Sequence, residues 1–545
     1  MRTRPPALAV LTAAGALLLA GCTADDAPEA EPTPASGGTL VYATGDAEPT
    51  CLDPHVGGNY PQALVSTQYL ESLVSKDSDG EIVPWLADAW TESEDGLSWT
   101  FTLREGVEFT DGTPFDAAAV AANVEHVKDP ATLSSTGYLA LEKVASVEVV
   151  DDLTARFVLT TPDSALLESL SQPWLAMESP TALERPQDVN CESPVGTGPF
   201  VVTAWTKQDS VTLERNDGYD SPPADAGHEG PALLDGVTWR FVPDSAARFA
   251  ALQAGEVDVI DNVQPDVLVT AARDGSLSEI DAPRPGASNR LELNAGKAPF
   301  DDERVREAFV RGIPLDDAIA SLFFGTADRS FSPLSSVEPL AVEDRDPFRT
   351  DVDAAQDLLD AAGWTERDAD GYRVKDGERL TLRFPVSTNQ SIPAEQSLFE
   401  QVQAGARDLG MDVQIDLLDL SSWYEALGAN EYDLVSAPYT KVGPDVLRIL
   451  YSTAGITPAP SGYFANHAQL SDPVLDDLLT RAAETSAADE RADLYDQAQR
   501  IILESHTVLP LYDQQNHYLV GEGVSGVRAL PPVSAVTLYD AHLTR

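Results

Sequence analysis

The sequence predicts an α/β protein, from its length, its composition and the alternation of helix and strand patterns in its second half. The chain has 545 residues, of which 43% are apolar and 23% charged, as in ordinary globular proteins. At roughly 100–200 residues per domain, this length predicts about three or more structural units. Helical and strand patterns alternate across residues 290–510, which is typical of a layered α/β lobe.

The first half of the chain is richer in strand patterns. Residues 39–43, between Gly38 and Gly45, suit a short strand, and residues 97–103 alternate apolar and polar side chains. Gly106 and Asp111-Gly112 mark a hairpin that we expect around Val107 and Phe109. Further strands are expected at 144–150, 154–159, 200–215 and 237–242, and helices at 115–128 and 246–254.

In the second half, helices are indicated by apolar residues at helical spacing and by glycines just past the helix ends. The expected helices cover 302–311, 353–362, 394–409, 473–484 and 488–503, with another between the strands 413–417 and 432–436. Strands are also expected at 291–293, 380–385 and 509–513.

The N-terminus has the pattern of an export signal. Arg2 and Arg4 precede an apolar run over residues 7–20, which is too short to span a bilayer. Leu19-Ala20-Gly21-Cys22 resembles the lipobox of bacterial lipoproteins, which implies that residues 1–21 are removed and that Cys22 carries lipid. An ordinary secretory signal with a chance cysteine is the alternative. Residues 22–38 are rich in Pro, Ala, Gly and acids, so we expect a disordered linker on the extracytoplasmic face of the membrane.

The net charge limits the classes of ligand that the protein can bind, and the cysteine content indicates a disulfide. The formal net charge is −54, which argues against binding to nucleic acid or to anionic lipid headgroups. With Cys22 lipidated, Cys51 and Cys191 remain as an even pair in an oxidising compartment. We predict a disulfide between them, and two buried free thiols are the alternative.

The usual catalytic and metal-binding motifs are absent from the sequence. There is no G-x-S-x-G, none of the seven Lys follows a Ser by three positions, and there is no H-E-x-x-H or P-loop. No cluster of histidines along the sequence offers metal ligands. We therefore expect no enzyme activity, no cofactor and no metal.

Four segments resemble the extracytoplasmic solute-binding proteins of peptide/nickel-type ABC importers, solute-binding protein family 5. Residues 109–117 read FTDGTPFDA, 193–200 read SPVGTGPF, 255–258 read GEVD, and Asn294 precedes PFDDERVREAF at 299–309. Their order and spacing are similar to those of the family over residues 40–540. Most of them are turns and caps: Gly196 and Gly198 are expected to supply unusual backbone angles, and Asp301 or Asp302 a helix N-cap.

The resemblance implies a periplasmic-binding-protein-like two-lobed clamp of type II with an extra α+β subdomain. Lobe I would comprise 39–75, 192–284 and 511–545, the subdomain 76–191 and lobe II 285–510. The ligand would lie between the lobes, which would close on it by a hinge near 284 and 511. The partners implied are the solute and the permease subunits of the importer, with the chain a monomer.

Candidate ligand-binding residues are polar and aromatic side chains expected near the cleft. They are Asp46, Glu48, Asn59, Tyr60, Asn294, Trp423, Tyr439, Lys441 and Asp445. Lys441 stands where the family often has a carboxylate for the α-ammonium of a peptide, so it would instead meet a carboxylate or phosphate. Asp445 would serve a cation.

The function expected is the capture of peptides or peptide-like solutes for an ABC importer. Within this class, a sugar, a nickel-chelate or a siderophore-like ligand is the alternative. A secreted, surface-anchored hydrolase is the alternative from another class, and a structural adhesion module is a third.

Overall fold

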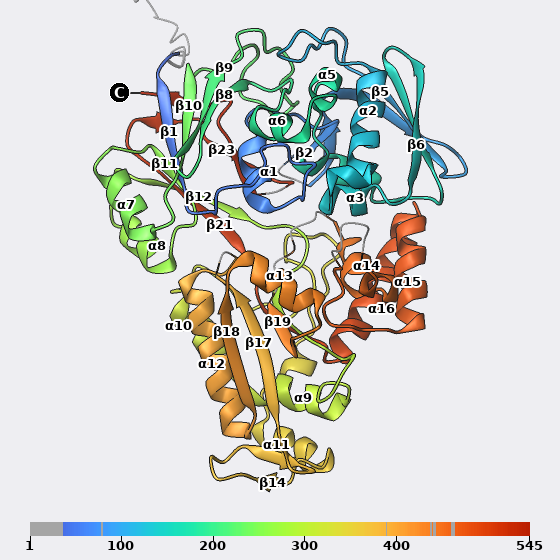
Figure 1. Cartoon of the computed structure of the whole chain (residues 1–545), viewed down its shortest axis with the longest axis vertical. Coiled ribbons are helices and arrows are strands. Elements are labelled where there is room, and N and C mark those ends of the chain that lie inside the picture. Colours follow the sequence, from blue (N-terminus) through green and yellow to red (C-terminus); the bar gives the residue numbers. More distant parts are fainter. Residues whose placement is uncertain are drawn as a thin grey trace, which may run out of the picture. The chain divides into compact units, whose positions relative to one another are not determined.

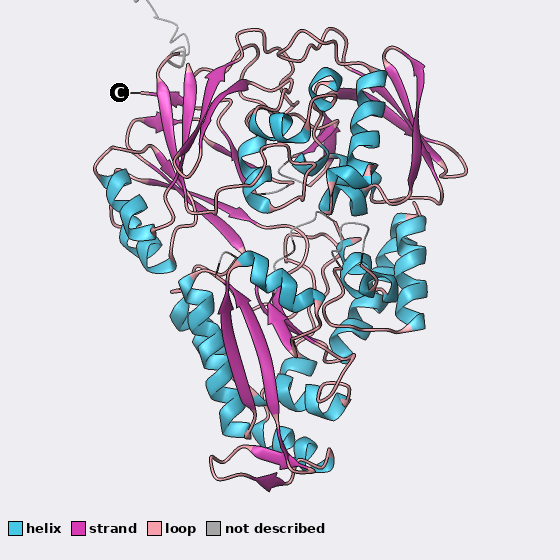
Figure 2. Cartoon of the chain, in the orientation of Figure 1, coloured by secondary structure: helices cyan, strands magenta, loops and turns pink. Residues whose placement is uncertain are grey.

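The protein is represented by a computed structural model, which describes residues 36–77, 80–388, 390–436, 439, 443–458, 464–532 and 534–544. The predicted signal peptide, Cys22 and most of the linker lie outside these residues. Within them, no helix combines the length and the apolar character needed to cross a bilayer. The α/β fold class is confirmed, because strands and helices share the described chain in eight sheets and sixteen α-helices (Figures 1 and 2).

The first lobe is built on a seven-stranded mixed sheet whose strand order is β12-β21-β11-β1-β10-β9-β8. Its strands are β1 (Thr39–Thr44), β8 (Phe200–Thr206), β9 (Ser210–Arg215), β10 (Gly236–Phe241), β11 (Val259–Ile260), β12 (Ser278–Pro283) and β21 (Gln515–Val520). β1 is parallel to both of its neighbours, β10 and β11. Tyr42 on β1 stacks on Trp239 of β10 with ring centroids 3.8 Å apart, so the centre of the sheet is held by aromatic packing.

A smaller four-stranded antiparallel sheet in the order β4-β5-β7-β6 forms the core of the extra subdomain. It comprises β4 (Ala87–Glu92), β5 (Ser98–Leu103), β6 (Val144–Asp151) and β7 (Thr154–Leu159), and α2 (Ala117–Lys128) packs on it (Figure 1). Side chains alternate along β5 so that Phe101 and Leu103 are buried, as expected for a strand with one face exposed to solvent. α2 begins at Asp116, whose side chain accepts a hydrogen bond from the Ala119 amide.

The second lobe combines two sheets. β13 (Asn289–Leu293) pairs antiparallel with β19 (Leu434–Ser436) and β20 (Val508–Tyr512). β17 (Thr381–Ser387) pairs parallel with β18 (Asp412–Leu418), and the crossover between them is α12 (Pro393–Leu409), which lies along β18 (Figure 1). The predicted helix–strand alternation of this region is therefore present, and β17-α12-β18 is a parallel βαβ unit.

Other helices complete the layers around these sheets. α9 (Glu303–Gly312) is capped by Asp302, as predicted, and α15 (Pro473–Glu484) packs on α16 (Ala488–Glu504). The remaining helices are α1 (Tyr60–Ser66), α3 (Thr136–Ala140), α4 (Leu166–Leu170), α5 (Pro180–Leu183), α6 (Gln187–Glu192), α7 (Ser245–Gln253), α8 (Pro265–Ala271), α10 (Asp316–Leu322), α11 (Val352–Ala361), α13 (Leu420–Gly428) and α14 (Val446–Tyr451).

Short strands form the edges of the described chain. They are β2 (Val74–Lys76) with β3 (Ile82–Pro84); β14 (Glu366–Arg367), β15 (Arg373–Lys375) and β16 (Glu378–Arg379); β22 (Val524–Ser525) with β25 (His542–Leu543); and β23 (Arg528–Leu530) with β24 (Ala535–Thr537). Four 3₁₀ turns lie at Pro130–Thr132, Pro173–Leu175, Asp346–Phe348 and Thr453–Ile456.

The predicted role of the glycines in SPVGTGPF is wrong. Neither Gly196 nor Gly198 has a positive φ. A Cβ at Gly196 would instead lie 2.0 Å from the Tyr69 carbonyl oxygen, and a Cβ at Gly198 would lie 2.6 Å from the Tyr69 carbonyl carbon. These glycines are therefore required by the close approach of the Tyr69 backbone, whose carbonyl accepts a hydrogen bond from the Gly198 amide at 3.1 Å.

The predicted disulfide is present. Cys51 and Cys191 are bonded across 140 residues of chain. The adjacent backbone reinforces the link, because the Leu52 amide donates to the Cys191 carbonyl at 2.8 Å. The bond joins the loop after β1 to the end of α6.

Candidate functional site

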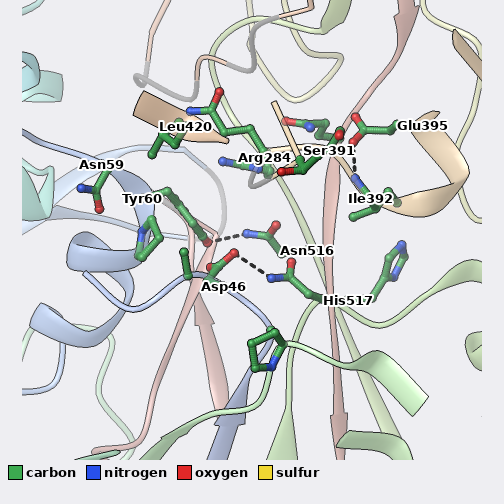
Figure 3. A pocket seen from close by; sticks show the side chains of 18 of the residues that line it. Asp46, Asn59, Tyr60, Arg284, Ser391, Ile392, Glu395, Leu420, Asn516 and His517 are labelled. Atoms are coloured by element: carbon green, nitrogen blue, oxygen red, sulfur yellow. Dashed lines mark hydrogen bonds between the residues drawn. The ribbon is translucent and has the colours of Figure 1, made fainter. Parts of the chain in front are cut away.

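A cavity of about 680 Å³ lies between the two lobes (Figure 3). This volume is in the range of about 300–1,000 Å³ typical of small-molecule sites. The first lobe lines it with residues 45–50, 58–61, 243, 245, 248, 262–265 and 514–517, and the second lobe contributes 388, 390–393, 395, 396, Leu420, Tyr424 and Tyr439. The lining is rich in amides and hydroxyls, with acidic and basic groups among them.

Asp46 is placed by the loop that follows β1. Its Oδ1 accepts a hydrogen bond of 2.7 Å from Asn262 Nδ2, and its amide donates to Thr44 Oγ1 at 3.1 Å (Figure 3). Enclosure in the cavity raises the pKa of Asp46, while the bond from Asn262 and the charge of Arg284 oppose that rise. The carboxylate is therefore held in a fixed orientation on the first-lobe side of the cavity.

Behind Asp46 lies a second acid, Asp261 at the end of β11. It accepts hydrogen bonds from the Gly45 amide at 2.7 Å and from the Tyr42 hydroxyl at 2.8 Å. Burial and the Asp46 carboxylate raise the pKa of Asp261 to about 6. The first-lobe wall thus contains two neighbouring acids, of which Asp46 lines the cavity.

Glu48 and Asn59 also line the cavity, and each is bonded within the first lobe. Glu48 Oε1 accepts from Trp205 Nε1 at 2.8 Å and from the Gln208 amide at 2.9 Å. Asn59 is the N-cap of α1 and accepts from the Gln62 amide at 3.2 Å. Both side chains therefore stabilise the wall to which they belong.

Tyr60 and Arg284 meet at the crossing between the lobes. The Arg284 guanidinium lies over the Tyr60 ring, 4.5 Å from its centroid. Asn516 Nδ2 donates to the Tyr60 hydroxyl, so β21 also fixes this ring (Figure 3). Burial raises the pKa of Tyr60, which keeps the phenol neutral.

The second-lobe wall begins at the N-terminus of α12. Ser391 Oγ donates to the Ser387 carbonyl at 2.7 Å, and Gln396 Nε2 donates to Ser391 Oγ at 3.1 Å. Glu395, buried below them, accepts from the Ile392 amide at 2.8 Å and from the Tyr512 hydroxyl at 2.7 Å (Figure 3). Burial raises the pKa of Glu395. This wall presents mainly neutral hydrogen-bonding groups.

The other predicted candidates lie in different environments. Tyr439 lines the cavity, and burial raises its pKa. Asn294 is 0% exposed, and its amide donates to Asn430 Oδ1 at 2.7 Å and to the Tyr432 carbonyl at 3.1 Å. Trp423 is 2% exposed and packs with Leu427 and Tyr432.

Asp445 is 1% exposed and pairs with Arg448 at 2.9 Å. Asn294, Trp423 and Asp445 are not among the residues that line the cavity. Each is accounted for by contacts within the second lobe, so their assignment as ligand contacts has no geometric support. Lys441 lies outside the described residues.

Sequence reasoning missed several polar lining residues, among them Arg284, Asn262, Tyr424 and Asn516. Tyr424 could have been found from helical spacing. Trp423 and Leu427 are four apart and share the buried face of α13, which turns the adjacent Tyr424 toward the cavity. Arg284 and Asn516 are brought together by the chain crossing, a long-range feature without a local signal.

Three side chains that the sequence analysis did not group lie close together, while the expectation of no metal site stays a prediction. Asp53, His55 and His126 have potential ligand atoms that all lie within 4.8 Å of one another. His55 and His126 are 71 positions apart in the sequence, and the packing of α2 against the loop after β1 brings them together.

Comparison with known proteins shows the family to which the chain belongs. Residues 81–460 match the family described as bacterial extracellular solute-binding proteins, family 5 Middle. The glutathione-binding protein GsiB of Salmonella paratyphi A is 30% identical over 85% of this chain and 86% of its own length. GsiB of Escherichia coli K12 is 30% identical over 91% of this chain and 92% of its own length.

Solved structures share the fold of this chain. DppA from Helicobacter pylori, in complex with the peptide STSA, has a TM-score of 0.80 at 24% identity, covering 94% of this chain and 99% of that one. NikA from Brucella suis, in complex with Fe(III)-EDTA, has a TM-score of 0.78 at 26% identity, covering 93% and 100%. The chain belongs to the bacterial extracellular solute-binding proteins of family 5, the non-enzymatic binding proteins of ABC importers.

Proposed function

We propose that this protein captures a peptide or peptide-like solute between its lobes and delivers it, chemically unaltered, to the permease of an ABC importer. The observation that carries the proposal is the cavity of about 680 Å³ with an acid and a guanidinium on its walls. A short peptide has an ammonium group at one end and a carboxylate at the other, so it complements such a pair. The similarity to proteins named for glutathione binding and to a peptide complex supports this ligand class.

Asp46 would receive the ammonium group of the solute. Asn262 already orients its carboxylate, so little conformational freedom remains to be lost when the ligand binds. A charge-assisted bond to an ammonium group is stronger than one between neutral groups. The incoming positive charge would also stabilise the ionised form of Asp46, whose pKa is raised by enclosure.

Arg284 would receive the carboxylate of the solute. Its guanidinium acts electrostatically on both Asp46 and Glu395, where it opposes the rise in pKa that burial causes, so it lies within range of both walls. Stacking on Tyr60 restricts its plane, and a planar guanidinium suits bidentate recognition of a carboxylate. Ser391, Gln396, Tyr424 and Tyr439 of the second lobe would contact the peptide backbone and side chains.

Closure of the lobes would complete the site. We propose the division into lobe I (39–75, 192–284, 511–545), the subdomain (76–191) and lobe II (285–510), with the hinge near 284 and 511. At that crossing the Arg284 amide donates to the Gln514 carbonyl at 2.9 Å, so the two connecting strands of chain support each other. A ligand favours closure only through contacts made with both lobes at once.

The lipobox-like Leu19-Ala20-Gly21-Cys22 supports attachment to the extracytoplasmic membrane face through lipid on Cys22, with 22–38 as the linker. Anchoring would keep a monomeric receptor near its permease and raise its effective concentration there. Globomycin, which blocks lipoprotein signal cleavage, should leave the protein in its unprocessed form. The variant Cys22→Ala, which lacks the cysteine that would carry the lipid, should be found in the soluble fraction or in the unprocessed form.

The ligand class is tested by isothermal titration of the tag-free mature protein with tripeptides including glutathione, with sugars and with anionic metal chelates. Binding of peptides, with release of the same mass on denaturation, supports the proposal. Binding of sugars or chelates alone overturns the ligand class, and release of a converted product overturns the role as a receptor.

A further inference from the structure

We propose that Asp53, His55 and His126 bind one divalent transition-metal ion of the zinc type, at a position separate from the solute cavity. Asp53 and His55 come from the loop between β1 and α1, and His126 comes from the last turn of α2. None of the three is among the residues that line the cavity. Two imidazoles and a carboxylate form a ligand set that zinc commonly takes. The proposal does not depend on the identity of the solute.

The spacing of the potential ligand atoms suits a single ion. Asp53 Oδ2 lies 3.1 Å from His126 Nε2, and Asp53 Oδ1 lies 3.8 Å from His55 Nδ1. Ligands about 2.0–2.1 Å from a tetrahedral zinc ion are about 3.4 Å from each other. The two observed separations involve different oxygens of Asp53, and ligand atoms of all three residues lie within 4.8 Å of one another, so side-chain rotations would bring them onto one ion.

The hydrogen bonding of His55 favours a cation at its Nδ1 atom. His55 Nε2 lies 2.8 Å from the Ala176 carbonyl oxygen, which can only accept, so Nε2 carries the proton. In the neutral ring, Nδ1 then has a lone pair, and it has no hydrogen-bond partner among the described residues. This lone pair faces the Asp53 carboxylate in a side chain that is 1% exposed. Two acceptors oppose each other there unless a cation lies between them.

A proton on His55 Nδ1 is the competing explanation for these contacts. A metal ion bound to Nδ1, with Nε2–H held by a carbonyl, is the usual outer-shell arrangement of a histidine ligand.

His126 has the same arrangement. The Thr132 hydroxyl donates its proton to the His126 carbonyl at 2.6 Å, so Thr132 Oγ1 is left to accept from His126 Nδ1 at 3.4 Å. Nε2 would then be unprotonated and directed at Asp53 Oδ2. The side chain of His126 is 18% exposed, which gives an ion a route from solvent.

Neighbouring groups hold the Asp53 carboxylate in place. Asn190 Nδ2 donates to Asp53 Oδ2 at 3.2 Å and to Glu178 Oε2 at 2.7 Å. The His55 amide also donates to Asp53 Oδ1 at 2.8 Å, so the carboxylate is oriented in advance.

The ion would link the β1–α1 loop to α2 beside the Cys51–Cys191 disulfide. The carbonyl that holds His55 belongs to Ala176, two residues after Trp174, which lines the cavity. Trp174 Nε1 donates to the Asn59 carbonyl at 3.3 Å. The ion would therefore stiffen the support of the first-lobe wall without touching the solute.

The test uses the tag-free, disulfide-intact protein after dialysis against a chelator. Titration with Zn²⁺ should give one site per chain, Co²⁺ should give the visible spectrum of a tetrahedral nitrogen-containing site, and Zn²⁺ should raise the melting temperature. Loss of an outer-shell partner typically weakens metal binding about tenfold to a hundredfold, so His126→Gln, which removes a ligand, should weaken Zn²⁺ binding by at least about tenfold. His228→Gln is the matched control, because His228 pairs with Asp540 at 2.8 Å and is similarly exposed.

Retention of stoichiometric Zn²⁺ affinity in His126→Gln, or the absence of Zn²⁺ and Co²⁺ binding in the wild type, would overturn the proposal. If His126→Gln does not fold, as judged by circular dichroism, the site is decided on the wild type by zinc anomalous scattering in crystals. A difference peak between Asp53, His55 and His126 supports the site, and a soaked crystal without one overturns it.

Discussion

The two walls of the cavity differ in charge and in how they are supported. The first-lobe wall carries Asp46 and, behind it, Asp261, which are braced by Asn262, Tyr42 and the backbone of Gly45. The second-lobe wall presents serine, glutamine and tyrosine side chains around the start of α12, and its acid, Glu395, is buried beneath them.

This difference suggests a division of labour. Charge preorganised in one rigid wall recognises the charged groups of a solute at little reorganisation cost. Neutral groups on the other wall add hydrogen bonds without requiring a particular side-chain sequence, because every peptide unit offers the same donor and acceptor. The first wall would then set the ligand class, and the second would strengthen binding on closure.

Removal of the Cys51–Cys191 disulfide, which supports the first wall, should have the largest effect, on the free energy of unfolding. Every cysteine of the sequence lies in the N-terminal 191 residues, so no disulfide can stiffen the second wall. Replacing both Cys51 and Cys191 by Ala should lower the free energy of unfolding by about 2–5 kcal/mol, since the bond closes a long loop. Urea denaturation with and without reductant measures this. Equal stability of the wild type and the double variant would show that the hydrogen bonds alone hold the loop.

Loss of the guanidinium should have the next largest effect, on affinity. Arg284→Gln removes the positive charge beside Asp46 and should weaken the binding of a peptide with a free carboxylate by about 2–3 kcal/mol, roughly 30–150-fold. Arg383→Gln is the control, because Arg383 is exposed and makes only a 3.9 Å contact with Glu431 among the ion pairs of the described residues. If both variants bind like the wild type in calorimetry, the charged wall does not select the ligand.

The neighbouring acids Asp46 and Asp261 should make the stability of the first lobe depend on pH. The folded pKa of Asp261, about 6, is above the unfolded value of about 3.9. Its contribution is thus fully present below the unfolded pKa of about 3.9 and is lost as the pH rises through 6. Asp261→Asn removes this loss, so relative to the wild type it should gain up to about 2 kcal/mol between pH 4.5 and 7.5.

Denaturant unfolding at the two pH values measures the change. Asp95→Asn is a control of opposite sign, because bonds from Ser93 and the Leu97 amide lower the pKa of Asp95. If the difference in unfolding free energy between the wild type and Asp261→Asn does not vary with pH, Asp261 is ionised in the folded protein throughout this range.

The neutral wall should give the smallest effect. Gln396→Ala removes a lining amide and its bond to Ser391, so affinity should fall by about 1 kcal/mol, or fivefold. Gln403→Ala is matched on the same helix: its amide donates to the Val413 carbonyl at 2.7 Å, and it does not line the cavity. A loss in Gln396→Ala as large as in Arg284→Gln would erase the distinction between the walls.

Local patterns predicted much of the fold. Glycine and proline punctuation and helical spacing located α9, α12, α15 and α16 to within about two residues, because these signals act along one segment. The expected hairpin around Val107 and Phe109 is instead a turn with a single bridge, Glu108 to Pro114. Its register is set by packing against Gly196, whose carbonyl accepts from the Thr110 amide.

The site was harder to predict, for a physical reason. Asp46, Glu48, Asn59 and Tyr60 follow the first strand of the sheet, and loops after strands commonly carry ligand contacts. Arg284, Asn262 and Asn516 meet them only after the chain has crossed between lobes. The cluster of Asp53, His55 and His126 likewise depends on contacts across 71 residues, which no local periodicity encodes.

The central claim is that the two ends of a zwitterionic, peptide-like solute are recognised by opposite charges in the cavity. Calorimetry with one tripeptide in four forms tests it most directly: free, N-acetylated, C-amidated and blocked at both ends. We expect each single block to weaken binding at least about tenfold and the double block to abolish it. Equal affinity for the free and the doubly blocked peptide would contradict the account.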